Sequence, residues 1–121
     1  MSGFSFPGVV EHHYRFCAWL LPKVSKFERD QRYLLGSRLQ NTSLDILEHL
    51  ISASVCPVEN KAVWVARASA RLEHLRFLFR LSYSIKMVNA RSYEYGAKSL
   101  TEMGRMLGGW QRTIQKVVGD S

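Results

Sequence analysis

Apolar residues recur at the spacing of one helical face in four segments of the chain, which cover residues 9–26, 28–55, 60–86 and 90–117. No strand-like alternation of convincing length and no internal repeat interrupts this pattern. The breaks between the segments are short, so consecutive helices must run antiparallel. We therefore predict an all-α fold, an up-down-up-down four-helix bundle at residues 9–117, with a flexible lead-in at residues 1–8 and a frayed tail at residues 118–121.

The segment boundaries carry local signals. Pro22 interrupts the first apolar stripe, so we expect a kink or a break there. Pro57 lies in the strongest break of the chain, and Asn60 is expected to be the N-cap of the third helix. Three glycines lie beside the stripe of the fourth segment: Gly104, Gly108 and Gly109. Either they let a neighbouring backbone or an RNA phosphate come close, or the last two end the regular helix.

The third segment combines two apolar arcs with an excess of positive charge. The first arc consists of Val65, Ala68, Leu72, Leu75 and Phe79. The second arc, well away from the first, consists of Leu78, Leu81 and Ile85, with Phe77 nearby. Between residues 60 and 91, seven basic residues face one acidic residue, which gives +6 of the chain's net +7. Such a helix has more to bury than one bundle core needs, so we expect it also to contact another chain and an anionic ligand.

Composition places the chain among single-domain globular proteins. It has 121 residues, of which 46% are hydrophobic and 22% charged, and a sequence pI near 9.8. A positive surface favours nucleic acid, an acidic membrane or an acidic protein as partner. The apolar runs are far shorter than the roughly twenty residues of a membrane span, and the start lacks the pattern of a signal peptide. We predict a cytoplasmic protein without membrane association, because bundle and subunit contacts explain the apolar faces better.

The two cysteines are expected to be buried free thiols. In an antiparallel arrangement of the first two helices, Cys17 lies opposite a residue near Ser37. Cys56 is then about 28 Å further along at 1.5 Å per residue. A disulfide requires Cα atoms within about 7 Å of one another.

No constellation of residues indicates an active site. A di-iron centre in a bundle uses Glu-x-x-His pairs, whereas Glu48-His49 and Glu73-His74 are adjacent and point apart. His13 and Cys17 share a helical face, but no second ligand pair could complete a metal site, so we favour a buried thiol beside a partly satisfied histidine. A glycine-rich phosphate loop is also absent. We predict that the protein is not an enzyme and holds neither a cofactor nor a metal.

The concentration of arginine on one helix favours nucleic-acid binding. Arginine forks bind phosphate in a bidentate manner, and nearby aromatic rings offer stacking platforms, although most of these rings are expected to pack in the core. Binding of this kind follows the phosphate backbone and weakens with salt. The candidate nucleic-acid-binding residues are Arg67, Arg71, Arg76, Arg80, Lys86 and Arg91, with Arg105 and Arg112 as weaker members.

Five runs of residues resemble a known family: 19–23 (WLLPK), 35–40 (LGSRLQ), 72–76 (LEHLR), 93–97 (YEYGA) and 104–110 (GRMLGGW). They are similar to the four-helix-bundle family that includes the accessory variability determinant (Avd) of diversity-generating retroelements. The resemblance covers about residues 14–112. One departure is Glu28, where the family pattern leads us to expect a proline at the start of the second helix.

The resemblance implies a basic, barrel-like homopentamer of four-helix protomers. It also implies an accessory role without catalysis, in which the protein associates with a reverse transcriptase that copies template RNA into mutagenised cDNA. The same fold occurs in bundle proteins encoded in intervening sequences of ribosomal RNA genes. Three hypotheses therefore stand: a retroelement accessory protein that binds reverse transcriptase and RNA or DNA, an orphan oligomeric bundle with a structural or general RNA-binding role, and a metal-dependent bundle enzyme. A neighbouring reverse-transcriptase gene would favour the first, and bound iron or zinc the third.

Overall fold

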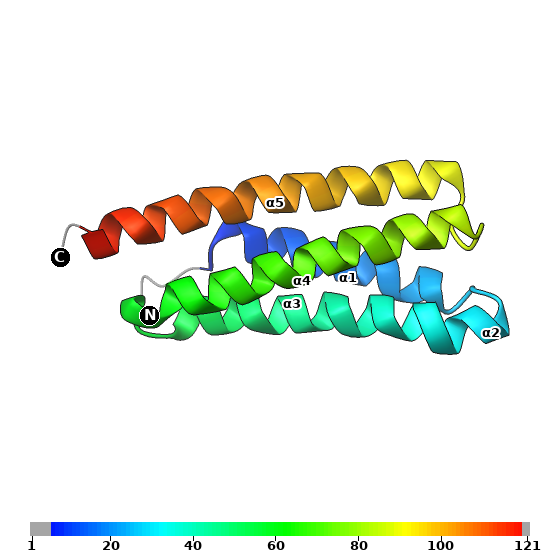
Figure 1. Ribbon diagram of the computed structural model, residues 1–121, viewed down its shortest axis with the longest axis horizontal. Coiled ribbons are helices and arrows are strands. Elements are labelled where there is room, and N and C mark those ends of the chain that lie inside the picture. The colour runs from blue at the N-terminus through cyan, green and yellow to red at the C-terminus, as the bar shows by residue number, and fades with distance from the viewer. Residues whose placement is uncertain (1–5, 120–121) are drawn as a thin grey trace.

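The computed structural model describes residues 6–119, so residues 1–5 of the predicted lead-in and residues 120–121 of the tail lie outside the described part. Four long helices lie side by side and reverse direction at each connection (Figure 1). They are α1 (Gly8–Val24), α3 (Ser37–Val55), α4 (Val58–Ser84) and α5 (Ala90–Gly119). A short helix, α2 (Arg29–Gln31), and a π-helical turn, η1 (Arg32–Gly36), lead into α3. No strand occurs within residues 6–119, which confirms the all-α prediction.

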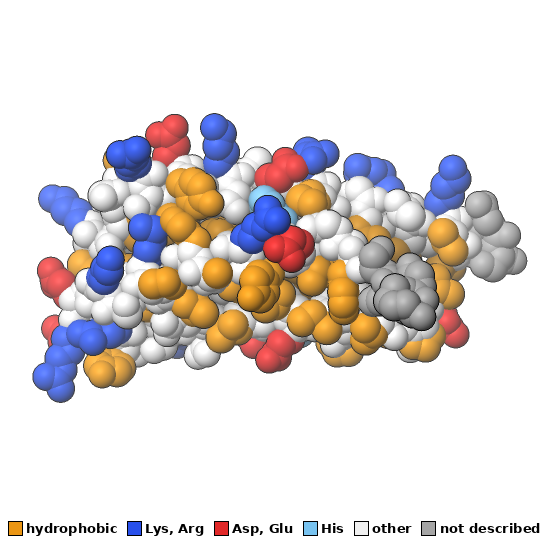
Figure 2. Space-filling model, turned by 180° about the vertical axis from the view of Figure 1, so that it is seen from behind, with side chains coloured by type: hydrophobic (Ala, Val, Ile, Leu, Met, Phe, Trp, Pro, Cys, Tyr) orange, Lys and Arg blue, Asp and Glu red, His pale blue; other side chains and the backbone are white. Residues whose placement is uncertain are grey.

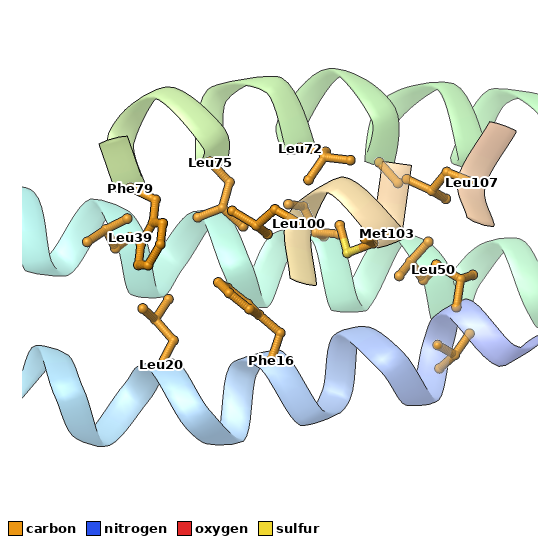
Figure 3. Close-up of a cluster of buried hydrophobic side chains, with 14 of the residues drawn as sticks. Phe16, Leu20, Leu39, Leu50, Leu72, Leu75, Phe79, Leu100, Met103 and Leu107 are labelled. Atoms are coloured by element: carbon orange, nitrogen blue, oxygen red, sulfur yellow. The ribbon is translucent and has the colours of Figure 1, made fainter. Parts of the chain in front are cut away.

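The core is a single cluster to which all four long helices contribute. Figure 3 shows side chains from α1, α3, α4 and α5 that point into this shared interior, among them Phe16, Leu39, Leu75 and Met103. Every member of the first predicted arc of α4 is at most 2% exposed. The stripe of α5 is buried at Leu100, Met103, Leu107 and Ile114, whereas Val117 at its end is 49% exposed. The other predicted positions of this stripe, Tyr93, Ala97 and Trp110, are half-buried. The helical period therefore predicted the core face, with its last position exposed.

Gly96 lets α5 approach both α4 and α1. A Cβ atom at this position would lie 2.4 Å from Cζ of Phe79 and 3.1 Å from Cη2 of Trp19. Two aromatic residues that precede Gly96 on α5 pack on the same rings. Tyr95 lies 4.8 Å from Trp19, and Tyr93 stacks 5.5 Å from Phe79, measured between ring centroids. Three helices thus meet around one position that has no room for a side chain.

The connection between α3 and α4 differs from the prediction. Asn60 is not an N-cap: α4 begins at Val58 with Pro57 in the N-cap position, and the Asn60 N–H donates to the Pro57 carbonyl at 2.9 Å. Proline has no backbone N–H to leave unpaired at this position, and its fixed φ is compatible with a helix start. The helix therefore begins earlier in the sequence than the predicted cap at Asn60. Lys61 links the start of α4 to the end of α3, because its Nζ donates to the carbonyls of Ala53 and Ser54 at 2.8 and 3.0 Å.

The first two predicted helices also depart from the expected bounds. Helix α1 starts at Gly8, within the predicted lead-in, and continues through Pro22 to Val24, so the helix is not broken at the proline. The second segment is not one regular helix, because η1 separates α2 from α3. At the end of this turn a Cβ on Gly36 would lie 2.7 Å from Cγ1 of Val24. This close approach joins the start of α3 to the end of α1.

Helix α5 is longer and more regular than predicted. It passes through Gly108 and Gly109 without interruption and includes Val118 and Gly119, so neither a helix end at the glycine pair nor fraying at these two residues is observed. The preceding turn contains Lys86 with a φ of 68°, a left-handed conformation unusual for a residue with a side chain. Asn89 caps α5, since its Oδ1 accepts the Ser92 N–H at 2.8 Å.

A polar cluster is enclosed between α1 and α3. His13 is fully buried, and its Nε2 donates to the Ser43 carbonyl at 2.7 Å, since a carbonyl can only accept. The Cys17 thiol donates to the same carbonyl at 3.6 Å, and His13 Nδ1 has no hydrogen-bond partner among the described residues. Burial lowers the pKa of His13 to about 4 and raises the pKa of Cys17 to about 11. A buried thiol beside a partly satisfied histidine is thus confirmed. Both cysteines are free, but Cys56 is half-buried rather than buried.

Replacing Gly96 with alanine is expected to destabilise the fold. The new methyl group collides with the Phe79 ring, and overpacking of this kind costs roughly 1–3 kcal/mol, which exceeds the gain of about 1 kcal/mol in helix propensity. Gly108→Ala is the matched control. Its Cβ would meet only the flexible end of Arg112 at 3.5 Å, so the free energy of unfolding should rise by about 1 kcal/mol. Urea denaturation measures both changes, and a stabilised Gly96→Ala variant would contradict the packing described.

Buried His13 is expected to make the protein sensitive to acid. Its pKa of about 4 lies below the unfolded value of 6.5, so the unfolded state takes up a proton first as the pH falls. The free energy of unfolding should be constant above pH 6.5 and decrease by up to about 3 kcal/mol between pH 6.5 and 4. Thermal denaturation across this range should show a flatter profile for His13→Gln. Equal slopes for the two proteins would exclude His13 as the cause.

Candidate nucleic-acid interface

The eight candidate basic residues do not form one continuous patch. They lie on α4, on the turn after it and on α5. Arg71 and Arg76 are half-buried, and the other six are exposed. Four of them line three separate grooves. Arg76 and Arg80 line a groove between α4 and α5, Arg71 lines one between α3 and α4, and Arg91 lines one between α1 and α5.

The groove between α4 and α5 brings Arg76 and Arg80 together. Two adjoining hollows of about 330 and 210 Å³ lie here and share Arg76 and Tyr93. Neither arginine forms an ion pair within residues 6–119. The Tyr93 ring is held in place by stacking on Tyr83, with ring centroids 4.6 Å apart and planes inclined by 9°. Glu73 also lines the groove but pairs with neither arginine. The groove therefore offers two guanidinium groups without an ion pair beside a fixed aromatic wall, an arrangement suited to phosphate.

Gly104 makes room for one of these arginines. A Cβ atom at this position would lie 3.3 Å from Nη1 of Arg76 and 3.6 Å from Cδ2 of Leu72. The group that packs closely against Gly104 is thus an arginine side chain, and not a neighbouring backbone. Gly108 and Gly109 face the end of Arg112, on their own helix.

The groove between α3 and α4 is a hollow of about 470 Å³. Its walls are formed by Arg38, Asn41, Thr42, Arg71, His74, Phe77 and Leu78. Arg71 is anchored to α3, because its Nη2 donates to Thr42 Oγ1 and to Asp45 Oδ2, both at 3.3 Å. Asp45 compensates part of the charge, so Arg71 is partly a structural residue. Arg38 is exposed in the same hollow, and nothing in its own helix singled it out.

The other candidates lie outside these two grooves. Arg67 packs over the Trp64 ring, 4.8 Å from its centroid. Arg105 forms a bidentate ion pair with Glu102, with 2.9 Å between Nε and Oε1, and this hydrogen bonding lowers the pKa of Glu102. Its charge is thus already compensated. Lys86 lies in the turn after α4, and Arg112 lies on α5 without an ion pair within the described residues.

The third groove places the candidate Arg91 beside Lys23, a basic residue of α1 outside the candidates predicted from the sequence. Lys23 and Arg91 line a hollow of about 290 Å³ with Trp19 and Tyr95. The Lys23 ammonium group lies 4.9 Å from the centroid of the Trp19 ring, a cation–π contact. Figure 2 shows basic side chains along the α5 edge and at the end of the bundle where α2 lies, with apolar side chains over α1 and α3.

Large apolar side chains are exposed on two faces. On α4, Phe77, Leu81 and Ile85 are 67%, 47% and 38% exposed, whereas Leu78 of the predicted second arc is half-buried and packs against the core. The second arc thus lies outside the core except at Leu78. On α1 and α3, the exposed apolar side chains are Tyr14, Leu44, Ile51 and Val55. Exposed apolar faces of this kind mark protein contacts more often than isolated surface residues do.

Two further searches concern metals and membranes. Among residues 6–119, no three His, Cys, Asp or Glu side chains are close enough to hold a metal ion. None of the described helices combines the length and the hydropathy needed to cross a membrane.

Comparison with known proteins gives a family. No curated protein matches the sequence. A sequence model described as bAvd-like matches residues 9–114, which include almost all of the four long helices. Because this match spans far more than half of the chain and coincides with the helical fold, the chain belongs to the bAvd-like family.

Proposed function

We propose that the protein is a non-catalytic accessory protein of a diversity-generating retroelement, which binds nucleic acid and the reverse transcriptase of the element. Membership of the bAvd-like family supports an Avd-type accessory role. The groove between α4 and α5 carries the nucleic-acid part of the proposal. Arg76 and Arg80 line it without carboxylate partners among the described residues, beside the stacked ring of Tyr93.

The chemistry of this groove favours a phosphate backbone over a small acidic ligand. Arginine binds phosphate through paired N–H donors and keeps its charge at any physiological pH. The shallow hollows do not enclose a molecule, and they continue along the helices. Template RNA or cDNA would therefore be held by its backbone, with little dependence on base sequence.

The exposed apolar faces support contacts with proteins. Leu81 and Ile85 of the second arc are exposed beyond Arg80 at the end of α4, so a reverse transcriptase that docks on them would be held beside the bound nucleic acid. The face on α1 and α3 is mostly free of basic residues, and Ile51 and Val55 on it are 40% and 64% exposed. We assign this second face to contacts between copies of the chain in a homopentamer, as the resemblance implies.

Replacing Arg76 and Arg80 should remove most of the RNA binding without affecting the binding of the reverse transcriptase. Tagged wild-type protein purified from its native host should carry the reverse transcriptase and template RNA. Arg76→Gln with Arg80→Gln should keep the reverse transcriptase but lose most of the RNA. In vitro, the slope of log affinity against log salt should become shallower by about 1.5, because each lost phosphate contact contributes about 0.7 to 0.9.

Arg105→Gln is the matched control for this experiment, since Glu102 already compensates that charge. Its RNA yield and salt slope should equal those of the wild type. Recovery of the wild-type protein with neither RNA nor a reverse transcriptase would contradict the accessory role and leave a structural bundle. An equal loss of RNA in both variants would show that total charge matters and the groove does not.

Introducing charge on the α1–α3 face should abolish self-assembly. Ile51→Glu with Val55→Glu places two carboxylates where apolar side chains are exposed, so the helical circular dichroism should be unchanged. Light scattering coupled to size exclusion should show a pentamer for the wild type and a monomer for this variant. Val63→Glu with Ala66→Glu, on the exposed side of α4, adds the same charge and should remain pentameric. A monomeric wild-type protein would contradict the proposed assembly.

A further inference from the structure

Phe77 is the most exposed phenylalanine among the described residues, ahead of Phe6 at 49%. Its side chain is 67% exposed, whereas Phe16, Phe27 and Phe79 are at most 4% exposed. No aromatic ring within residues 6–119 stacks on it. Burying a phenylalanine stabilises a protein by about 1.5–3 kcal/mol relative to its exposed form. The exposed Phe77 ring does not contribute this stabilisation in the isolated chain. A ligand that covers the ring would bury it.

Phe77 lies between two arginine-lined hollows. It lines the hollow between α3 and α4 together with Arg38 and Arg71. It also lines the hollow between α4 and α5 together with Arg76 and Arg80. The ring is therefore a ridge on α4 with a pair of guanidinium groups on either side, on the face of the bundle where α4 lies between α3 and α5 (Figure 1).

A single nucleic-acid strand fits this arrangement better than a protein surface does. The side chains that line the two hollows include four arginines and one carboxylate, Glu73, while Asp45 pairs with Arg71 from α3. An apolar protein segment laid over Phe77 would bury arginines without partners, which is costly. A strand that crosses α4, about 10 Å wide, brings a phosphate to each side and an apolar base to the middle. Only an unpaired base can present its face to the ring.

We propose that Phe77 is a stacking platform for one unpaired base of a single-stranded RNA or DNA that crosses α4, with its flanking phosphates at Arg38 and Arg71 on one side and Arg76 and Arg80 on the other. The proposal rests on the nucleic-acid binding proposed above and adds that the ligand is a single strand. In this proposal, the preference for single-stranded over double-stranded nucleic acid depends on the Phe77 ring. The arginines supply affinity for either form.

The test compares a fluorescein-labelled oligouridylate with an RNA duplex of the same length. Phe77→Leu keeps an apolar side chain but removes the π face, so the affinity for the single strand should fall about 5- to 150-fold. The affinity for the duplex should not change. Phe77→Trp offers a larger face and should bind the single strand at least as tightly as the wild type. Circular dichroism should be unaffected, because the ring is exposed.

Tyr33→Leu is the matched control, an aromatic ring in η1 that is 69% exposed and lines neither hollow. It should bind both ligands as the wild type does. If Phe77→Leu binds the single strand normally while Arg76→Gln with Arg80→Gln loses both ligands, the platform is excluded and the nucleic-acid function stands. If the wild type binds neither ligand, both proposals fail. A changed oligomeric mass of Phe77→Leu, with single-strand affinity intact, would assign the ring to a protein contact and overturn the platform.

Discussion

The approach of α5 to α4 at Gly96 shapes the surface that we assign to nucleic acid. Because this position has no side chain, the Phe79 ring lies where a Cβ atom would stand. Tyr93, one helical turn earlier on α5, then stacks against Phe79 and Tyr83 and forms the wall of the groove that Arg76 lines. The Tyr93 side of this groove offers no carboxylate to the arginines, and Glu73, which lines the groove from α4, forms no ion pair with them within residues 6–119. Core packing thus sets the aromatic side of the groove, opposite the arginines of α4.

Helix α4 combines three kinds of residue in one period. Val65, Leu72 and Phe79 face the core, Leu81 and Ile85 face outward, and arginines lie at the borders between these faces. An apolar helix face stabilises the fold only where it is buried, so the exposed second side of α4 adds little to the stability of the isolated chain. The stability of an isolated chain therefore does not account for the sequence of α4. Contacts with another protein or with an unpaired base would account for it, because both bury apolar surface beside the arginines.

The fold was largely predictable because the hydrophobic period of each helix is a local property. The arcs of α4, the stripe of α5 and the buried pair of His13 and Cys17 all follow from spacing alone. The helix bounds depend on details that spacing does not contain, such as the N-cap position of Pro57. The roles of the basic residues depend on tertiary contacts. Charge density singled out Arg76 and Arg80, but only the pairing of α3 with α4 ties Arg71 to Asp45 and brings Arg38 into the same hollow.

The groups that control stability and the groups that we assign to binding are physically separate. His13 and Cys17 lie between α1 and α3, where burial keeps the imidazole neutral and the thiol protonated near neutral pH. Arg76 and Arg80 line the groove between α4 and α5, away from this cluster. Acid therefore acts on the fold through His13, whereas salt acts on the exposed guanidinium groups. A loss of binding at neutral pH and high salt must then arise at the interface, because the buried cluster is shielded from the ions that screen the surface.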